Sequence, residues 1–317
     1  MKLLPLLAAC LMSCCAHAEP GAPQRWTLGD ASRWDYVEYD AQRKRLFLTR
    51  GERVQVLDGA SGKQVGEIPA TAGVHGVALA QDLKLGFTSN GRNNSVTVFD
   101  LDTLQVKQEV KIPGVNPDAI LYEMKSHKLY TFNGKSLDVT VIDVPSMKVR
   151  ATIPVGGKPE FAAADGAGNV FVNIEDKGEL VVIDTGSDMV RAHWPLGGCE
   201  DPTGLALDTV NARLFSVCQN KVMMVTDASN GKAVAQVAIG GHPDAVVIDA
   251  ASHTVYSSNG DGELSVIRQV DADHYRALPP LATAKGARTM VQDPASGRLY
   301  LPTVVDKAFV VLVVPTR

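Results

Sequence analysis

The chain has 317 residues, of which 45% are hydrophobic and 21% charged, and its formal net charge at pH 7 is −4. Such a composition is typical of a compact globular protein. Because the chain is mildly acidic and has no runs of Lys or Arg, we expect neither nucleic acid nor an anionic membrane as a partner.

Residues 1–18 predict a cleavable export signal. Lys2 precedes an apolar stretch from Leu3 to Met12, and Ala16, His17 and Ala18 form an A-x-A cleavage site. A lipoprotein signal at Cys10 or Cys14 is the weaker interpretation, because the first leaves a short apolar region and the second has the bulky Met12 two positions before it. No later run reaches the ~18 apolar residues of a membrane span. We therefore expect residues 19–317 to be a monomer in the periplasm, without membrane insertion.

The segment from Gly114 to Val155 contains four short runs rich in β-branched and aromatic residues, separated by polar or glycine-containing turns. This pattern predicts a four-stranded antiparallel meander. A lone sheet of this kind cannot bury a core, so it needs similar neighbours.

Such neighbours recur along the chain seven times. The residue just before each predicted first strand is Trp34, Val74, Pro117, Pro159, Pro202, Pro243 and Ala287. The last residue of each predicted third strand is Asp58, Asp100, Asp143, Asp184, Asp227, Arg268 and Val313. Four strands in each period of about 42 residues are typical of a β-propeller blade, so we predict one all-β, seven-bladed domain over residues 19–317.

The two ends of the chain predict how the ring closes. Only three residues follow the third strand of the last blade, so this blade lacks an outermost strand. We expect Gln24 to Leu28 to supply it by pairing with Phe309 to Val314, which would remove the open edges.

The repeats, among them NSVTVFD and DVTVIDVPSMKVRATIPVGGKPE, resemble those of the YVTN family of bacterial β-propellers, which includes periplasmic YncE-type proteins. The resemblance extends over nearly everything after residue 23. It implies the propeller fold and export, and it says little about function, because the shared residues are those that build blades.

Most aspartates have a structural interpretation. Those that end third strands, and those in the hairpins between first and second strands, precede tight turns. There a short carboxylate can accept hydrogen bonds from backbone amides two residues further on. The second group comprises Asp40, Asp165, Asp208, Asp249 and Asp293.

Two cysteines follow the export signal, Cys199 and Cys218. The repeat places both at one end of blade five, so in an oxidising compartment they could form a disulfide that closes a loop of about 18 residues. Two isolated buried thiols are the alternative.

Residues at the starts of the first strands should converge on one mouth of the central channel. This predicted ring comprises Asp35, His75, Asp118, Glu160, Thr203, Asp244 and Arg288. Just outside it we expect Trp34, Lys158, Asp201 and His242. A solvated channel mouth is the simplest interpretation. The carboxylates and His75 could also hold a divalent cation, with Asp118, Glu160, Asp244 and His75 as candidate ligands, or orient a polyol against Trp34. No other cofactor is indicated.

Two functional hypotheses follow. The favoured one is a non-catalytic binding or scaffold protein that takes a protein or small ligand on its loop-rich channel face. The second, by analogy with similar seven-bladed rings, is a lactonase-like hydrolase or lyase with Glu160 or His75 as general base and Asp118 and Asp244 as holders of metal or substrate. Motifs of serine hydrolases, zinc proteases, nucleotide-binding loops and thiol-redox proteins are absent from the sequence.

Overall fold

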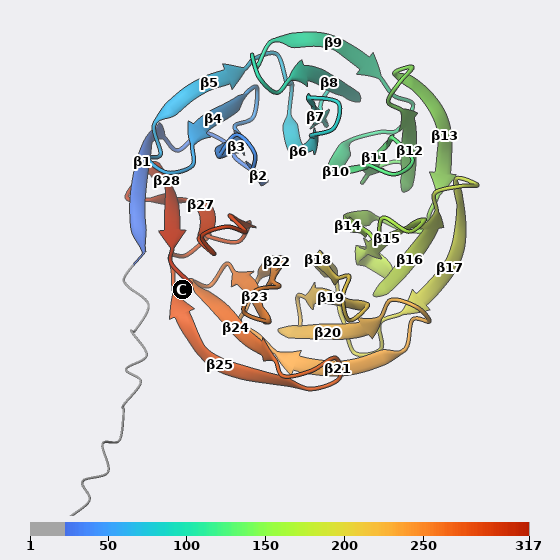
Figure 1. Cartoon of the computed structure of the whole chain (residues 1–317), viewed down its shortest axis with the longest axis vertical. Helices are drawn as coiled ribbons and strands as arrows, with labels where there is room; N and C mark the ends of the chain where they lie inside the picture. The colour runs from blue at the N-terminus through green and yellow to red at the C-terminus, as the bar shows by residue number, and fades with distance from the viewer. Residues whose placement is uncertain (1–22, 317) are drawn as a thin grey trace, which may run out of the picture.

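The computed structural model describes residues 23–316, so the predicted export signal lies outside the described residues. The described chain folds into seven four-stranded antiparallel sheets arranged around a central channel (Figure 1). The seven-bladed propeller predicted from the repeats is therefore confirmed.

Each blade runs from an inner strand at the channel to an outer strand at the rim. Blade one comprises β2 (Val37–Asp40), β3 (Arg45–Thr49), β4 (Val54–Asp58) and β5 (Gln64–Ile68). Blade two comprises β6 (Val74–Ala80), β7 (Leu85–Asn90), β8 (Ser95–Asp100) and β9 (Val106–Lys111). Blade three comprises β10 (Pro117–Glu123), β11 (Lys128–Asn133), β12 (Asp138–Asp143) and β13 (Lys148–Pro154).

The remaining blades follow the same order. Blade four comprises β14 (Pro159–Ala164), β15 (Asn169–Ile174), β16 (Glu179–Asp184) and β17 (Met189–Pro195). Blade five comprises β18 (Pro202–Asp208), β19 (Arg213–Cys218), β20 (Val222–Asp227) and β21 (Ala233–Ala238). Blade six comprises β22 (Pro243–Asp249), β23 (Thr254–Asn259), β24 (Glu263–Gln269) and β25 (Tyr275–Ala282). Blade seven comprises β26 (Val291–Gln292), β27 (Leu299–Val305), β28 (Ala308–Val314) and β1 (Gln24–Asp30).

A short 3-10 helix, η1 (Glu175–Lys177), follows β15. Among residues 23–316, no helix is long and apolar enough to cross a membrane.

The core lies between neighbouring blades, because both faces of the middle strands are apolar. Between blades three and four, for example, Tyr130, Phe132 and Val141 pack with Val172 and Val181. The outer strands are more exposed and more polar, as in β9, whose sequence is VKQEVK. Charged rims of this kind discourage pairing with other chains.

The ring closes as predicted. Strand β1 pairs antiparallel with β28, with Trp26 opposite Val311. The Trp26 side chain is buried and lies 5.6 Å from the ring of Tyr300. First and last segments of the chain thus share one sheet, shown in blue and red in Figure 1.

The inner strands of blades one and seven begin two and three residues later than the sequence predicts, at Val37 and Val291. The preceding segments bond to neighbouring blades instead. The Tyr36 amide donates to the His75 carbonyl, and the Thr289 hydroxyl donates to the Asp35 carbonyl. These contacts tie blades seven, one and two together at the channel.

Turn aspartates have the role predicted for them. Asp58, for example, accepts hydrogen bonds from the Ser61 hydroxyl and from the amides of Ser61 and Ala60. These bonds, above all the one from the Ser61 hydroxyl, hold the pKa of Asp58 below its usual value. Asp40 likewise accepts the amides of Gln42 and Arg43 in the first hairpin of blade one.

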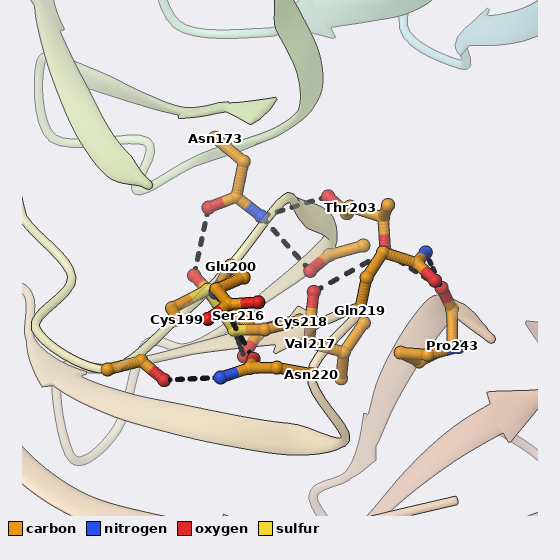
Figure 2. Close-up of a disulfide and its surroundings, with 12 residues drawn as sticks. Asn173, Cys199, Glu200, Thr203, Ser216, Val217, Cys218, Gln219, Asn220 and Pro243 are labelled. Carbon is orange, nitrogen blue, oxygen red and sulfur yellow. Dashed lines mark hydrogen bonds between the residues drawn. A yellow bond between two sulfur atoms is a disulfide. The ribbon is translucent and has the colours of Figure 1, made fainter. Parts of the chain in front are cut away.

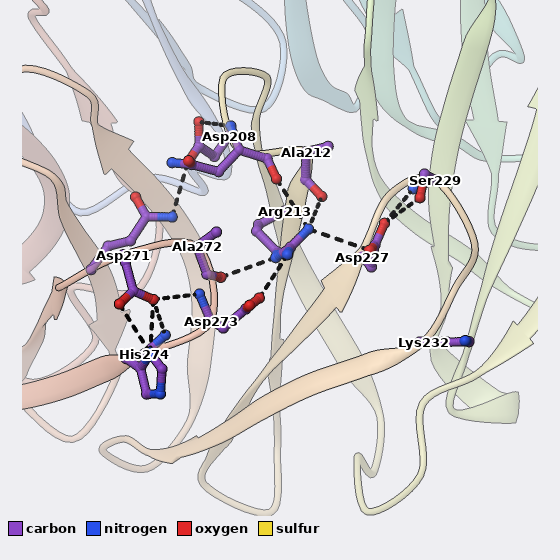
Figure 3. Close-up of polar contacts among 12 residues, drawn as sticks. Asp208, Ala212, Arg213, Asp227, Ser229, Lys232, Asp271, Ala272, Asp273 and His274 are labelled. Carbon is purple, nitrogen blue, oxygen red and sulfur yellow. Dashed lines mark hydrogen bonds and ion pairs between the residues drawn. The ribbon is translucent and has the colours of Figure 1, made fainter.

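Basic residues that begin the second strands of blades one, three and five reach over the next blade. Arg213 Nε donates to the Ala272 carbonyl at 3.0 Å, and its Nη2 lies 2.7 Å from Asp273 Oδ1 (Figure 3). Arg45 contacts the Leu101 carbonyl in the same way, and Lys128 contacts Thr185 and Asp188. These inter-blade clamps fasten the hairpin face of the ring.

Cys199 and Cys218 form a disulfide in blade five, with their Cα atoms 5.4 Å apart (Figure 2). Both side chains are buried. The bond joins the loop that enters β18 to the end of β19.

Candidate functional site

The channel mouth is built from residues of the loops that enter the inner strands. In Figure 1 strands β2, β6, β10, β14, β18 and β22 surround the channel, and each blade turns its inner strand toward it. Residues separated by about 42 positions in the chain are therefore neighbours around the opening. Their charged side chains form three ion-paired groups.

The first group joins blades one, two and three. His75 Nδ1 lies 2.7 Å from Asp35 Oδ2 and 3.5 Å from Asp118 Oδ1. Since an ionised carboxylate only accepts, Nδ1 carries the proton of the shorter contact. Burial lowers the pKa of His75, but the hydrogen bond to Asp35 and the charges of both carboxylates outweigh it and leave the pKa above the ordinary value.

Lys158 is the centre of the second group. Its Nζ lies 3.3 Å from Glu160 Oε2 and also contacts Glu175 Oε2. The two carboxylates outweigh burial and raise the pKa of Lys158. Lys158 is consequently a fixed positive charge between two acids of blade four.

The third group joins blades six and seven. Arg288 Nε lies 3.0 Å from Asp244 Oδ2, and the Arg288 guanidinium lies 5.8 Å from the centre of the Trp34 ring. Trp34 itself packs on Phe309, with ring centres 6.2 Å apart. Trp34 is therefore flanked by Phe309 and Arg288, which leaves less of its ring free for a polyol than the sequence suggested.

The remaining predicted residues lie apart from these charges. Thr203 is buried, and its hydroxyl donates to the Pro243 carbonyl, so it joins two blades. His242 and Asp201 have positive φ in the loops before β22 and β18. Gly260 packs closely on the backbone and Cβ of His242. These three residues shape the rim.

Burial shifts several acids of the mouth toward their protonated forms. It raises the pKa of Glu160 to about 8, helped by the charge of Asp118, and that of Asp244 to about 6 against the pull of Arg288. The pKa of Asp118 is also raised, chiefly by burial. Crowded carboxylates in a low-dielectric site penalise one another's ionised forms.

An aromatic pair forms the floor of the mouth. Tyr36 and Phe161, one residue beyond Asp35 and Glu160, meet across the channel with ring centres 5.6 Å apart. Burial raises the pKa of Tyr36, and so do the charges of Asp118, Glu160, Asp244 and Asp35. The Tyr36 hydroxyl is thus within electrostatic reach of acids from four blades.

A cavity of about 160 Å³ lies beyond the aromatic pair, lined mainly by apolar residues such as Val77, Ile120 and Met290. None of the charged mouth residues lines it. Glu38 is its one acid, and burial raises the pKa of this residue to about 7. The charged residues of the mouth, which we call the cup, are therefore separate from the apolar lining of this cavity.

Tyr36, Phe161 and Glu175 lie at the mouth but were not predicted from the sequence as part of the site. A signal for each was present in the repeat. The residue after the ring position is small in the other blades, as in Gly76 and Ala119, and aromatic only in blades one and four. Glu175 follows a second strand at the position that is Gly in blades two, three and six.

The fold, once known, can be compared with solved structures. A chain of Kuenenia stuttgartiensis hydrazine synthase superposes with a TM-score of 0.78 at 15% identity, covering 96% of this chain and 98% of that one. The WD40 repeats of RRP9 superpose with a TM-score of 0.81 at 10% identity, covering 93% of this chain and 100% of that one. A chain of the mitotic checkpoint complex gives 0.81 at 14% identity, covering 99% of both.

The chain shares their fold. At such low identities, nothing beyond the seven-bladed ring follows from the likeness. No protein-family profile matches the sequence, and no curated protein matches it either. The YVTN resemblance accordingly remains a resemblance of repeats, and the function has to be argued from the cup.

Proposed function

We propose that the protein is an exported, periplasmic β-propeller binding protein, which takes a small ligand or a segment of a partner protein into the cup at its channel mouth. The observation that carries this proposal is the convergence of three ion-paired groups from six blades over one aromatic floor. Blade packing needs none of these charges at the hub, whereas a binding site uses a few convergent polar groups over an apolar base.

Two observations support export. The first 18 residues have the charge, apolar stretch and cleavage site of a secretory signal. The Cys199–Cys218 disulfide is the kind of bond that persists in oxidising compartments.

A charge-conserving pair of substitutions tests the binding proposal. We would immobilise the mature protein, pass periplasmic extract over it, and identify retained proteins and small molecules by mass spectrometry. The cup variant Asp244→Asn/Arg288→Gln removes one ion pair without changing the net charge. Its matched control, Arg43→Gln/Asp102→Asn, removes an Arg–Asp pair of 2.7 Å among the turns of the hairpin face.

We expect the wild type and the control to retain the same ligand and the cup variant to lose it. Equal retention by all three proteins, with unchanged melting temperatures, would place binding elsewhere on the ring. Retention of nothing by the wild type would contradict the proposal itself.

A hydrolase is the second candidate, and the raised pKa of Glu160 is the observation in its favour. A carboxyl with a pKa of about 8 is mostly protonated at neutral pH, so it suits a general acid better than the general base proposed from the sequence. His75 already donates its Nδ1 proton to Asp35. A panel of sugar lactones, assayed with the wild type and Glu160→Gln, tests this candidate: turnover lost in the variant would support it, and no turnover by the wild type would exclude lactonase activity.

A further inference from the structure

The group formed by Asp35, His75 and Asp118 differs from the other two groups in the cup. Lys158 and Arg288 each supply a permanent positive charge to the acids beside them. The first group has two carboxylates and one imidazole. One Nδ1 proton cannot serve both acids, and the shorter contact assigns it to Asp35.

Asp118 is therefore the carboxylate that the Nδ1 proton does not serve. Its side chain is 17% exposed, and its carboxylate accepts no hydrogen bond from any residue between 23 and 316. The nearest side-chain nitrogen that could neutralise it is His75 Nδ1 at 3.5 Å. A largely buried carboxylate without a donor is costly, and an unfilled requirement of this kind is typical of a site that expects another positive group.

The geometry of the three side chains suits a metal ion. One ligand atom from each lies within 4.8 Å of the other two. Ligand bonds of zinc to nitrogen or oxygen are about 2.0–2.2 Å long, so tetrahedral ligand atoms lie roughly 3.4 Å apart. The contacts of 2.7 Å and 3.5 Å in this group bracket that separation.

We propose that Asp35, His75 and Asp118 bind one divalent transition-metal ion of the zinc class, through His75 Nδ1 and one oxygen of each aspartate, with the ion displacing the Nδ1 proton to solvent. This inference rests on the proposed function, since it assigns part of the binding cup. A site with a nitrogen ligand and only two carboxylates favours zinc, cobalt or nickel over calcium and magnesium, which require more oxygen ligands. Glu160 and Asp244 are not ligands, because Lys158 and Arg288 occupy them.

Three protein ligands leave a coordination position free, as in catalytic zinc sites. In this cup the free coordination position would be available to an anionic or neutral electron-pair donor of the molecule that the cup binds. The imidazole has little freedom to turn away, because its Nε2 edge packs against Gly91, where any side chain would approach Nε2 to 2.6 Å. The blades thus hold His75 with Nδ1 toward both aspartates.

Metal titration of the chelator-treated mature protein tests the proposal directly. Zn²⁺ would be titrated against a chromophoric chelator, Co²⁺ would be followed by its visible d–d absorption, and Ca²⁺ and Mg²⁺ would serve as comparison ions. ¹⁵N NMR of the imidazoles would report which nitrogen of His75 is ligated. Asp118→Asn and Asp35→Asn remove one ligand each at constant shape, and Asp244→Asn is the matched control at the equivalent position of blade six.

We expect one Zn²⁺ per chain, displaced by Co²⁺ but not by Ca²⁺ or Mg²⁺, a ligation shift at His75 Nδ1, and affinity that falls by about 100-fold in Asp118→Asn but is retained in Asp244→Asn. Failure to bind Zn²⁺ or Co²⁺, or equal losses in Asp118→Asn and Asp244→Asn, would overturn the proposal. The two proposals fail separately. A wild type that retains a ligand from the extract but binds neither Zn²⁺ nor Co²⁺ would contradict only this inference, whereas Zn²⁺ binding by a wild type that retains nothing would contradict only the proposed function.

Discussion

Cys199 and Cys218 occupy in blade five the positions that Gly114 and Asn133 occupy in blade three. The cysteines are 19 residues apart in sequence, as are the glycine and the asparagine. In blade three a Cβ on Gly114 would collide with the Asn133 side chain, whose Nδ2 donates to Asp138 and Thr140. Gly240 and Asn259 repeat the arrangement in blade six. The disulfide is a covalent substitute for a polar fastening used elsewhere in the ring.

An asparagine in place of Cys218 would find no hydrogen-bond acceptors at the corresponding positions of blade five. Val222 and Met224 stand where Asp138 and Thr140 stand in blade three. We expect Cys199→Gly/Cys218→Asn to lower the free energy of unfolding by about 2–5 kcal/mol, through loss of the bond and burial of an unpaired amide.

Adding Val222→Asp and Met224→Thr should recover part of that loss, because they restore the acceptors. Urea unfolding of the three proteins measures both steps, and dithiothreitol should weaken only the wild type. The interpretation is wrong if the four-site variant is no more stable than the double variant.

The inter-blade clamp of Lys128 predicts an uneven response to alanine. Lys128 Nζ lies 2.6 Å from Asp188 Oδ1, and both side chains are less than a tenth exposed. Lys128→Ala would leave a buried carboxylate with only the half-exposed Arg150 beside it, so we expect a loss of about 3 kcal/mol.

Lys84→Ala is the control, because Lys84 forms an exposed pair with Asp102 and should cost under about 1 kcal/mol. Chemical denaturation followed by tryptophan fluorescence measures both. Similar losses in the two variants would show that burial does not set the strength of the clamp.

Ring closure predicts that the first strand is indispensable. A chain beginning at Ser32 would lack β1, expose the edge of β28 and lose the buried Trp26, whose removal alone would cost about 3–5 kcal/mol. We expect a melting temperature lower by about 10 °C and aggregation through the open edge. A chain beginning at Pro23 should melt like one that comprises residues 19–317. If the chain beginning at Ser32 also melted at that temperature, closure by β1 would be contradicted.

Glu38 predicts a pH dependence of stability. Burial raises its pKa from 4.5 to about 7, so between these values the folded protein holds a proton that the unfolded chain has released. The contribution of Glu38 to the unfolding free energy therefore falls as the pH rises from 4.5 to about 7. Glu38→Gln should be more stable than the wild type at pH ~8, by about 1–3 kcal/mol, and should lose that advantage at pH ~4. Melting curves of both proteins at the two pH values test this prediction. If Glu38→Gln were more stable than the wild type by the same amount at both, ionisation of Glu38 would not be the cause.

The number of blades and the ring closure could be predicted from the sequence alone, because the strands of one blade are consecutive in the chain. Four apolar runs and their turns fall within about 42 consecutive residues, and turn aspartates such as Asp58 mark five of the seven periods. The start of an inner strand was less predictable. At Val37 and Val291 it depends on hydrogen bonds to other blades, which no local pattern records.

The sequence by itself determined which residues would stand around the channel mouth, because the repeat fixes where each inner strand begins. Only the tertiary structure decided which of those residues form ion pairs with one another. Lys158 turns to Glu160 and Glu175, Arg288 turns to Asp244, and His75 is left between Asp35 and Asp118. Pairing of this kind depends on distances of a few ångströms between side chains of different blades, and a repeat defines positions only to the nearest residue.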